Sequence, residues 1–204
     1  VTAETGRGGA LIRGSSCGVN RGKEGVRLLK PADDSNEGAT AFFFCGLACS
    51  GKSTLARFLE TRLPAKRLSV DEHVLARHDV GVSDEELGHL ARATREEFWV
   101  QGERHLRSVG HVLFDEASGA EPAELMGSPG TNAGHPHCVL FLDVPLDTLR
   151  ERLATRNRDL PATAHFIPIA ELERFAEVFE RPTKAEGLLL LTVGEEDSHE
   201  DVLA

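Results

Sequence analysis

The feature that most constrains this sequence is a loop bounded by two glycines, which directly follows a wholly apolar run. The loop, residues 46–53 (GLACSGKS), matches the pattern G-x-x-x-x-G-K-[ST] at every fixed position. The run before it, residues 41–45 (AFFFC), is typical of a strand buried on both faces in a parallel sheet. Residues 52–63 are typical of a helix. Backbone N–H groups in such a loop converge on an anion at the positive end of the helix dipole, so the sequence predicts a phosphate-binding unit.

The rest of the chain alternates between strand patterns and helix patterns. Four further apolar runs are expected to be strands, at residues 67–70, 111–114, 138–143 and 188–193. Helices are expected at residues 145–156 and 169–179, and a capping-box pattern at Ser83 and Glu86 opens a long helical segment toward residue 109. This alternation predicts an α/β fold of three layers, with a five-stranded parallel sheet and helices on both faces. Together with the loop at residues 46–53, it predicts the P-loop NTPase fold.

Residues 1–38 differ in composition from the rest of the chain. They contain eight of the twenty glycines and no sustained apolar periodicity, so they are expected to form a flexible basic Gly/Arg-rich tail. Residues 39–204 are expected to form one domain, because a chain of 204 residues supports a single core more readily than two. A transit peptide is the alternative for the arginine-rich tail, although no clear amphipathic helix is present.

Charge and composition exclude several classes of protein. The net charge is −10, and because residues 1–30 carry six Lys or Arg against two Glu, the remainder is strongly acidic. An acidic body repels nucleic-acid backbones, so a broad nucleic-acid surface is not expected, although a small basic pocket is compatible with it. No apolar run approaches the roughly 20 residues of a membrane span. Four cysteines without paired CxxC motifs indicate a reducing, cytoplasmic compartment.

The loop and the third strand contain the candidate nucleotide and metal ligands. Lys52 would supply a positive charge to the β and γ phosphates, and the Ser53 hydroxyl would ligate Mg²⁺. Asp115 ends an apolar strand, where a carboxylate can orient Mg²⁺ or one of its waters; a surface acid at a strand end is the alternative. The residues expected to bind the nucleotide are Gly46, Leu47, Ala48, Cys49, Ser50, Gly51, Lys52, Ser53 and Thr54.

Two other acids, each at the end of a strand, indicate two different reactions. Asp71 is expected beside the loop and outside the metal site, where it could accept the proton of an attacking hydroxyl as a general base. Glu116 could instead polarise a water molecule, and the same architecture would then hydrolyse ATP. Capping of the following helix is the structural alternative for Asp71.

Arginines gather at the end of the helix that follows the fourth strand. Arg152 and Arg156 are four residues apart and therefore share one face of that helix, close to Arg150 and Arg158. A closing lid brings such guanidinium groups onto phosphates and excludes water. The alternative is an exposed helix whose terminal cations are favoured by its dipole.

Five segments together resemble the P-loop kinase-like proteins grouped with zeta toxins, chloramphenicol phosphotransferase and the kinase domain of phage polynucleotide kinase. The resemblance implies that Asp71 is the base for the substrate hydroxyl and that Arg152 or Arg156 contacts ATP. Glu116 departs from the pattern, since a small residue is more usual there, and the tail has no counterpart. The segments are residues 42–54 (FFFCGLACSGKST), 68–72 (LSVDE), 111–115 (HVLFD), 139–157 (VLFLDVPLDTLRERLATRN) and 179–187 (FERPTKAEG).

These observations together predict a kinase that uses ATP and Mg²⁺ to phosphorylate a hydroxyl of a small molecule. The catalytic residues would be Lys52, Asp71, Arg152 and Arg156. Alternatives are a 5′-hydroxyl polynucleotide or nucleoside kinase, and an ATPase switch or partner-binding module that uses Glu116. The acceptor is expected between Asp71 and the helical segment 73–108, where the candidate contacts are Arg77, His78, Arg92, Arg95 and Trp99.

Overall fold

A computed structural model gives the fold of the chain. It describes residues 20–21, 26–27, 39–77, 84–108, 110–116, 135–160, 165–183 and 189–203. Ser83, His78 and most of the predicted tail lie outside these residues. Within the tail, β1 (Asn20–Arg21) and β2 (Val26–Arg27) pair antiparallel. No helix in the described part of the chain is long and apolar enough to cross a membrane.

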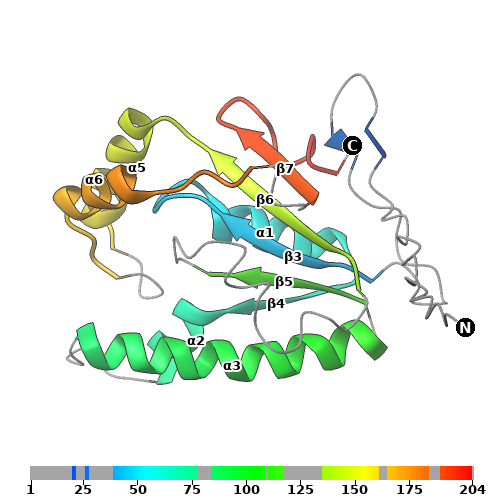
Figure 1. Ribbon diagram of the computed structural model, residues 1–204. Coiled ribbons are helices and arrows are strands. Elements are labelled where there is room, and N and C mark those ends of the chain that lie inside the picture. The colour runs from blue at the N-terminus through cyan, green and yellow to red at the C-terminus, as the bar shows by residue number, and fades with distance from the viewer. Residues whose placement is uncertain are drawn as a thin grey trace, which may run out of the picture.

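The predicted parallel sheet is confirmed. In the described residues it has five strands in the order β4-β5-β3-β6-β7, and every neighbouring pair is parallel (Figure 1). The phosphate loop leaves the central strand, whose neighbours on both sides also end near it. The strands are β3 (Ala41–Cys45), β4 (Ala65–Ser69), β5 (His111–Asp115), β6 (His137–Asp143) and β7 (Leu189–Gly194).

The helices agree with the sequence pattern except after β4. The predicted second strand, residues 67–70, was placed too late: β4 begins and ends earlier, and Val70 is the first residue of a helix. That helix buries Val70 and Val74, four residues apart on one face, and places two acids in its first turn, where the dipole favours them. The helices are α1 (Lys52–Arg62), α2 (Val70–Arg77), α3 (Asp84–Ser108), α5 (Leu146–Arg158) and α6 (Ile169–Val178).

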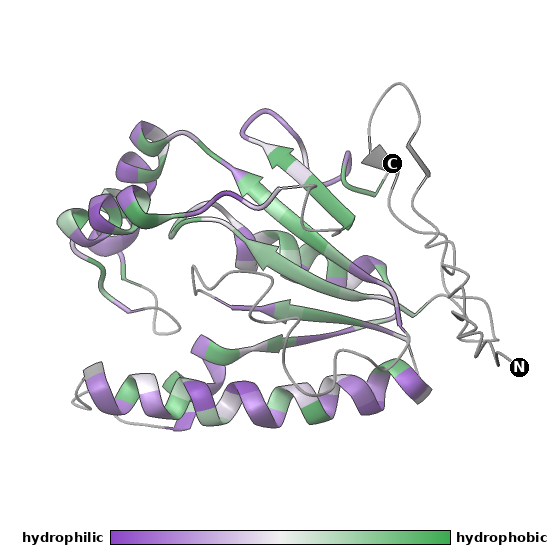
Figure 2. Ribbon diagram, viewed as in Figure 1, coloured by the Kyte–Doolittle hydropathy of each residue, from purple (hydrophilic) through white to green (hydrophobic). Residues whose placement is uncertain are grey.

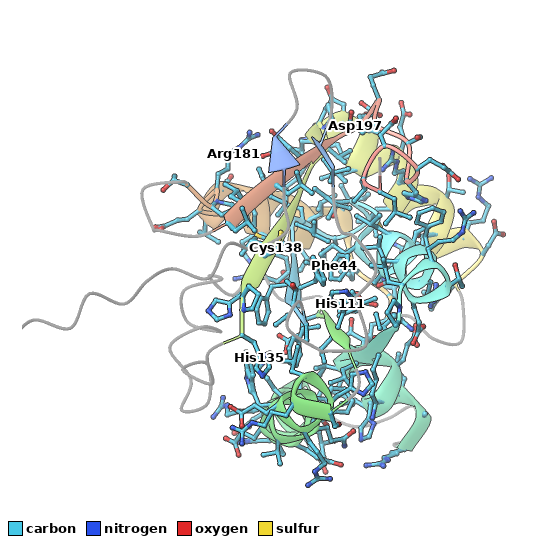
Figure 3. The ribbon with its side chains drawn as sticks, turned by 90° about the vertical axis from the view of Figure 1, so that its right-hand side faces the viewer. Phe44, His111, His135, Cys138, Arg181 and Asp197 are labelled. Atoms are coloured by element: carbon cyan, nitrogen blue, oxygen red, sulfur yellow. The ribbon has the colours of Figure 1, made fainter. Side chains whose placement is uncertain are left out.

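Side chains that alternate along β3 divide the core between the two faces of the sheet. Phe42 and Phe44 pack with α1 on one face, whereas Phe43 packs with α2 and α3 on the other. In Figure 1, α1 lies behind the sheet and α3 runs along its lower side. The strands are mainly hydrophobic and α3 is mixed (Figure 2), as expected for a sheet covered on both faces. Figure 3 shows Phe44 in the interior, with Asp197 near the edge of the molecule.

A third cluster joins α5 and α6 to the phosphate loop. Leu149 and Leu153 of α5 and Leu172 of α6 are almost completely buried, and they pack against the loop residues Leu47 and Ala48. Figure 1 shows both helices at the end of the sheet to which β3 and β6 point. This contact explains why arginines of α5 can reach the loop.

Candidate active site

The phosphate loop has a backbone conformation that its glycines make possible. Gly46 has φ of 142° and Gly51 has φ of 104°, both in the region that favours glycine. A Cβ atom on Gly46 would lie 2.8 Å from the Leu142 carbonyl oxygen, so a side chain does not fit there without movement. Cys49 also has a left-handed backbone, with φ of 66°. The loop is therefore a tight turn held against the end of β6.

Lys52 is buried in the loop with its ammonium group on the loop carbonyls. Its Nζ donates to the carbonyl oxygens of Gly46 at 2.6 Å and Leu47 at 2.9 Å, and the residue is only 6% exposed. Burial lowers the pKa of Lys52, while the nearby Asp115 opposes that shift. An ammonium group that is buried and hydrogen-bonded to neutral carbonyls is a site where an anionic ligand would gain Coulomb energy.

Ser53 and Asp115 meet beside Lys52, as the sequence predicts. The Ser53 hydroxyl donates to Asp115 Oδ1 over 3.0 Å, and Asp115 is 2% exposed at the carboxyl end of β5. A hydroxyl and a carboxylate oxygen are ligands that suit Mg²⁺, a hard cation. The pair therefore fits the predicted metal site, and it lies next to the predicted position of the phosphates.

An arginine that the sequence reasoning missed holds the other oxygen of Asp115. Arg67, on β4, donates its Nε to Asp115 Oδ2 over 2.9 Å. The same guanidinium makes a two-point contact with Glu72, which also pairs with Arg57 of α1. Glu72 is next to Asp71 in the sequence, but in the structure it belongs to this ion-pair network. The signal in the sequence was Arg67 itself, an arginine in a short strand that is soon followed by the acids Asp71 and Glu72.

Asp71 lies in the first turn of α2, at the end of β4 where it was expected. It is the second residue of the helix and therefore not its N-cap, so the capping alternative does not apply. Burial raises the pKa of Asp71; His165 lowers it, Asp115 raises it, and Lys52 lowers it. Ser69, two residues before Asp71, is the register partner of Asp115, so the first turn of α2 lies at the end of β5. A carboxylate with a raised pKa beside the phosphate loop has the properties of a general base.

Glu116 is buried and paired with an arginine of α3. The Nε of Arg95 donates to both carboxylate oxygens of Glu116, each over 2.9 Å, and Glu116 is 6% exposed. The pairing ties α3 to the end of β5. In this arrangement a guanidinium occupies the carboxylate oxygens that would have to polarise a water molecule.

The four arginines of α5 have different surroundings. Arg156 reaches the phosphate loop: its Nη1 contacts Cys49 Sγ at 3.6 Å and its Nη2 donates to the His165 carbonyl. Its Nε is buried and has no hydrogen-bond partner among the residues that the structure describes. Arg152 pairs at 3.8 Å with Glu195. Arg150 pairs with two acids of α5 and α6, and Arg158 is exposed. Of the two arginines singled out by their shared helix face, Arg156 therefore contacts the loop and Arg152 contacts the turn after β7.

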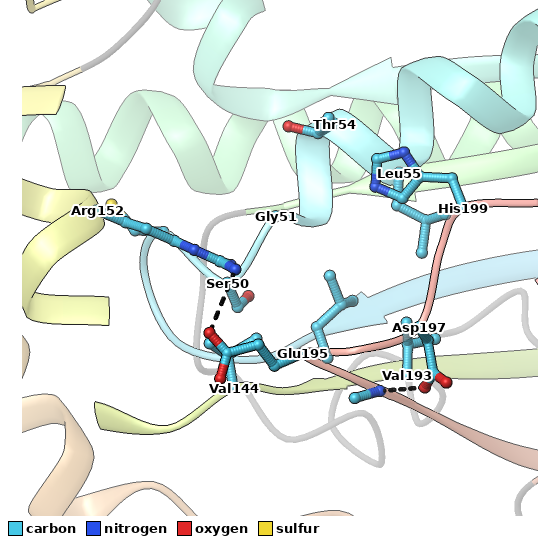
Figure 4. A pocket seen from close by; sticks show the side chains of 13 residues that line it. Ser50, Gly51, Thr54, Leu55, Val144, Arg152, Val193, Glu195, Asp197 and His199 are labelled. Atoms are coloured by element: carbon cyan, nitrogen blue, oxygen red, sulfur yellow. Dashed lines mark hydrogen bonds and ion pairs between the residues drawn. The ribbon is translucent and has the colours of Figure 1, made fainter. Parts of the chain in front are cut away.

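A cavity of about 360 Å³ opens beside the loop, between the start of α1 and the ends of β6 and β7 (Figure 4). Arg152 and Glu195 face each other across one side of it, and Asp197 is held in the turn after β7 by the Gly194 N–H. Sequence reasoning missed the contribution of this turn, because nothing in residues 194–199 resembles a binding motif. The lining residues are Cys49, Ser50, Gly51, Thr54, Leu55, Leu142, Val144, Arg152, Val193, Gly194, Glu195, Asp197 and His199.

The predicted acceptor contacts on α2 and α3 have different surroundings. Trp99 is half-buried and packs against Phe114 and Phe43 of the core, with ring centroids 4.7 Å and 5.6 Å away. Arg95 pairs with Glu116, and Arg77 and Arg92 are exposed. From the sequence alone, the charged residues of segment 73–108 could not be divided into those that face the sheet and those that face solvent.

The fold and the loop define this chain as a P-loop kinase-like protein of the P-loop NTPase fold. Comparison with protein families gives the same result, because the AAA domain family matches residues 42–182, which is more than half of the chain. The chain belongs to that family. The comparison with curated proteins found no match.

Three solved structures illustrate the similarity. A candidate kinase from Chloroflexus aurantiacus is 22% identical, with a TM-score of 0.65 over 81% of this chain and 95% of its own. Kti12 of Chaetomium thermophilum, in complex with ADP-AlF3, is 20% identical, with a TM-score of 0.57 over 79% and 93%. A sugar kinase from Janibacter is 15% identical, with a TM-score of 0.54 over 81% and 90%. At these identities the similarity establishes the fold.

Proposed function

We propose that the protein transfers the γ-phosphoryl group of ATP to a hydroxyl of a small molecule, with Asp71 as the general base. The observation that carries the proposal is the position of Asp71, a half-buried carboxylate in the first turn of α2. The charge of Lys52 acts on it, and it is separate from the Ser53 and Asp115 pair. In a kinase with an alcohol acceptor, such a carboxylate can accept the proton of the attacking hydroxyl.

The chain's own groups account for each part of the reaction. The acceptor oxygen attacks the γ-phosphorus in line, its proton passes to Asp71, and ADP leaves with the electron pair of the broken P–O bond. Lys52 offsets negative charge on the phosphates once they displace the loop carbonyls from its ammonium group. Ser53 and Asp115 would hold Mg²⁺, which supplies charge neutralisation at the phosphates when it is bound.

Arg156 and Arg152 are the candidates for bringing positive charge to the phosphates from α5, the helix expected to act as the lid. Arg156 already contacts the loop at Cys49, and its buried Nε has no hydrogen-bond partner within the described part of the chain, so an anion could use this donor. Arg152 lines the cavity beside the loop, and we assign that cavity to the nucleoside of ATP. Both residues lie on α5, which packs on the loop through Leu149 and Leu153.

The ATPase alternative is less well supported. It requires Glu116 to direct a water molecule, but Arg95 holds both oxygens of that carboxylate. A 5′-hydroxyl polynucleotide or nucleoside acceptor uses the same chemistry as a small alcohol, and the acidic body of the chain argues against long nucleic acids. A cytoplasmic location stays a prediction from the cysteine pattern of the sequence.

The decisive experiment is a transfer assay with γ-labelled ATP and Mg²⁺ over a panel of hydroxyl compounds that includes 5′-hydroxyl oligonucleotides. We expect slow release of phosphate without an acceptor and a large increase in transfer with the right one. Asp71→Asn is expected to reduce transfer by about 10²–10⁴-fold, the usual contribution of a general base, without weakening ATP binding. Phosphate release that is independent of every acceptor and insensitive to Asp71→Asn would refute the proposal.

A further inference from the structure

The guanidinium of Arg67 lies between two carboxylates that belong to different elements. Its Nε and Nη2 lie 2.9 Å and 2.8 Å from Asp115 Oδ2. Its Nη1 and Nη2 lie 3.0 Å and 2.5 Å from the two oxygens of Glu72. The Arg67 side chain is 9% exposed. Arg67 thus joins the end of β5 to the first turn of α2, the turn that carries Asp71.

Helix α1 closes these contacts into a ring. Ser53 and Arg57 are four residues apart on α1 and share a face of that helix. Ser53 donates to Asp115 Oδ1, and Arg57 pairs with Glu72. Starting from α1, the ring runs through Asp115, Arg67 and Glu72 and returns to α1. It links the helix that begins in the phosphate loop to the helix that carries the proposed base.

We propose that Arg67 is a positioning residue for Mg²⁺-dependent nucleotide binding, because it fixes which oxygen of Asp115 faces Ser53. This inference rests on the proposed function. Arg67 occupies Oδ2, so only Oδ1 is left on the side of Ser53 and the phosphate loop. A planar guanidinium has enough donors in fixed directions to hold two carboxylates at once, whereas the single ammonium of a lysine does not fix their orientation. Partners behind a metal ligand commonly set metal affinity in this way.

Arg57 provides a matched control within the same ring. It contacts Glu72 but not Asp115, and its side chain is 52% exposed. Loss of Arg57 removes one ion pair of the ring and leaves the Arg67 contact with Asp115 in place. A specific role for Arg67 therefore predicts a clear difference between the same substitution at the two arginines.

The test is the affinity of the full chain for a fluorescent N-methylanthraniloyl derivative of ADP, measured in Mg²⁺ and again in EDTA. The dissociation constant in EDTA divided by that in Mg²⁺ reports how much the metal strengthens binding, without any phosphoryl transfer. We expect Arg67→Met to reduce this ratio by about 10-fold or more. The affinity in EDTA should be unchanged, which also shows that the variant is folded. Arg57→Met should leave the ratio within about twofold, and Arg67→Lys should give an intermediate value.

The outcomes separate this inference from the proposed function. If the wild type shows an Mg²⁺ effect and Arg67→Met keeps or increases it, the positioning role of Arg67 is wrong and the kinase proposal stands. Equal losses in Mg²⁺ and EDTA would mean a merely structural role and would also overturn the inference. If the wild type shows no Mg²⁺ effect, the proposed function fails and this inference fails with it. Should Arg67→Met not fold, an unchanged ratio in Arg67→Lys refutes the role.

Discussion

The substitution Gly46→Ala tests whether the backbone of the phosphate loop is as constrained as its geometry indicates. The added Cβ would lie 2.8 Å from the Leu142 carbonyl oxygen and 2.9 Å from Ser50 Oγ. The backbone φ of 142° is one that residues with a side chain rarely adopt. The close contact and the backbone strain both arise at residue 46. The Leu142 carbonyl belongs to β6, which is buried and cannot move without disturbing the sheet.

The expected destabilisation follows from these two effects. A strained backbone costs on the order of 1–3 kcal/mol, and the contact with the Leu142 carbonyl brings the estimate to about 3 kcal/mol. For a domain of this size each kcal/mol lowers Tm by about 2–4 °C, so we expect a decrease of about 6–12 °C. Gly88→Ala is the matched control, because Gly88 lies exposed within α3 and a Cβ there meets nothing within 4 Å. That change should stabilise the protein by about 0.5–1 kcal/mol.

Thermal unfolding followed by circular dichroism measures both variants, and a titration with ADP and Mg²⁺ measures the loop itself. Gly46→Ala should weaken nucleotide binding as well as lower Tm, since the same backbone forms the anion site. Gly88→Ala should leave binding unchanged. If Gly46→Ala changed Tm by less than about 2 °C and bound ADP normally, the inference that glycine is required at this position would be wrong.

Three further predictions concern charge and domain limits. Burial raises the pKa of Asp71, so phosphoryl transfer should decrease as the pH falls through that raised value. For the same reason, ionised Asp71 destabilises the fold near pH 7. Asp71→Asn should therefore raise Tm near pH 7 but not near pH 3, where Asp71 is protonated. Thermal unfolding across pH 3–8 checks the sign, and a lower Tm for Asp71→Asn than for the wild type at pH 7 would contradict it. Arg156→Met should weaken ATP binding by about 10-fold, whereas Arg158→Met should not, as titration calorimetry can show; equal effects would remove the basis for a lid role. Removal of residues 1–38 should leave the transfer rate within about twofold, and a collapse of activity would mean that the domain begins earlier.

The order of the main elements could be predicted because the local pattern and the tertiary environment agree. Residues 41–45 form a wholly apolar run, and a strand buried on both faces needs such a run. The boundary after β4 could not be predicted in the same way. Val70 fits a strand as well as a helix. Its place in α2 depends on its burial against the face of the sheet that α2 and α3 cover.

The site divides in a similar way. Lys52 and Ser53 belong to a motif that is continuous in the chain, and Asp115 follows an apolar strand, so all three could be located from local signals. Arg67 and Glu195 could not, because each becomes important through a partner that is distant in the sequence. Glu116 shows the same limit: its pairing with Arg95 depends on how α3 packs against the sheet.

The sequence by itself determined the phosphate loop, the parallel sheet that carries it and the carboxylates at the ends of the strands. These features depend on residues near one another in the chain, where apolar periodicity and backbone freedom act directly. Only the tertiary structure decided which charged groups pair. Arg67 meets Asp115 because β4 and β5 lie side by side, and Arg156 meets Cys49 because α5 packs on the loop. Ion pairs form over a few ångströms of space, and the distance along the chain does not limit them.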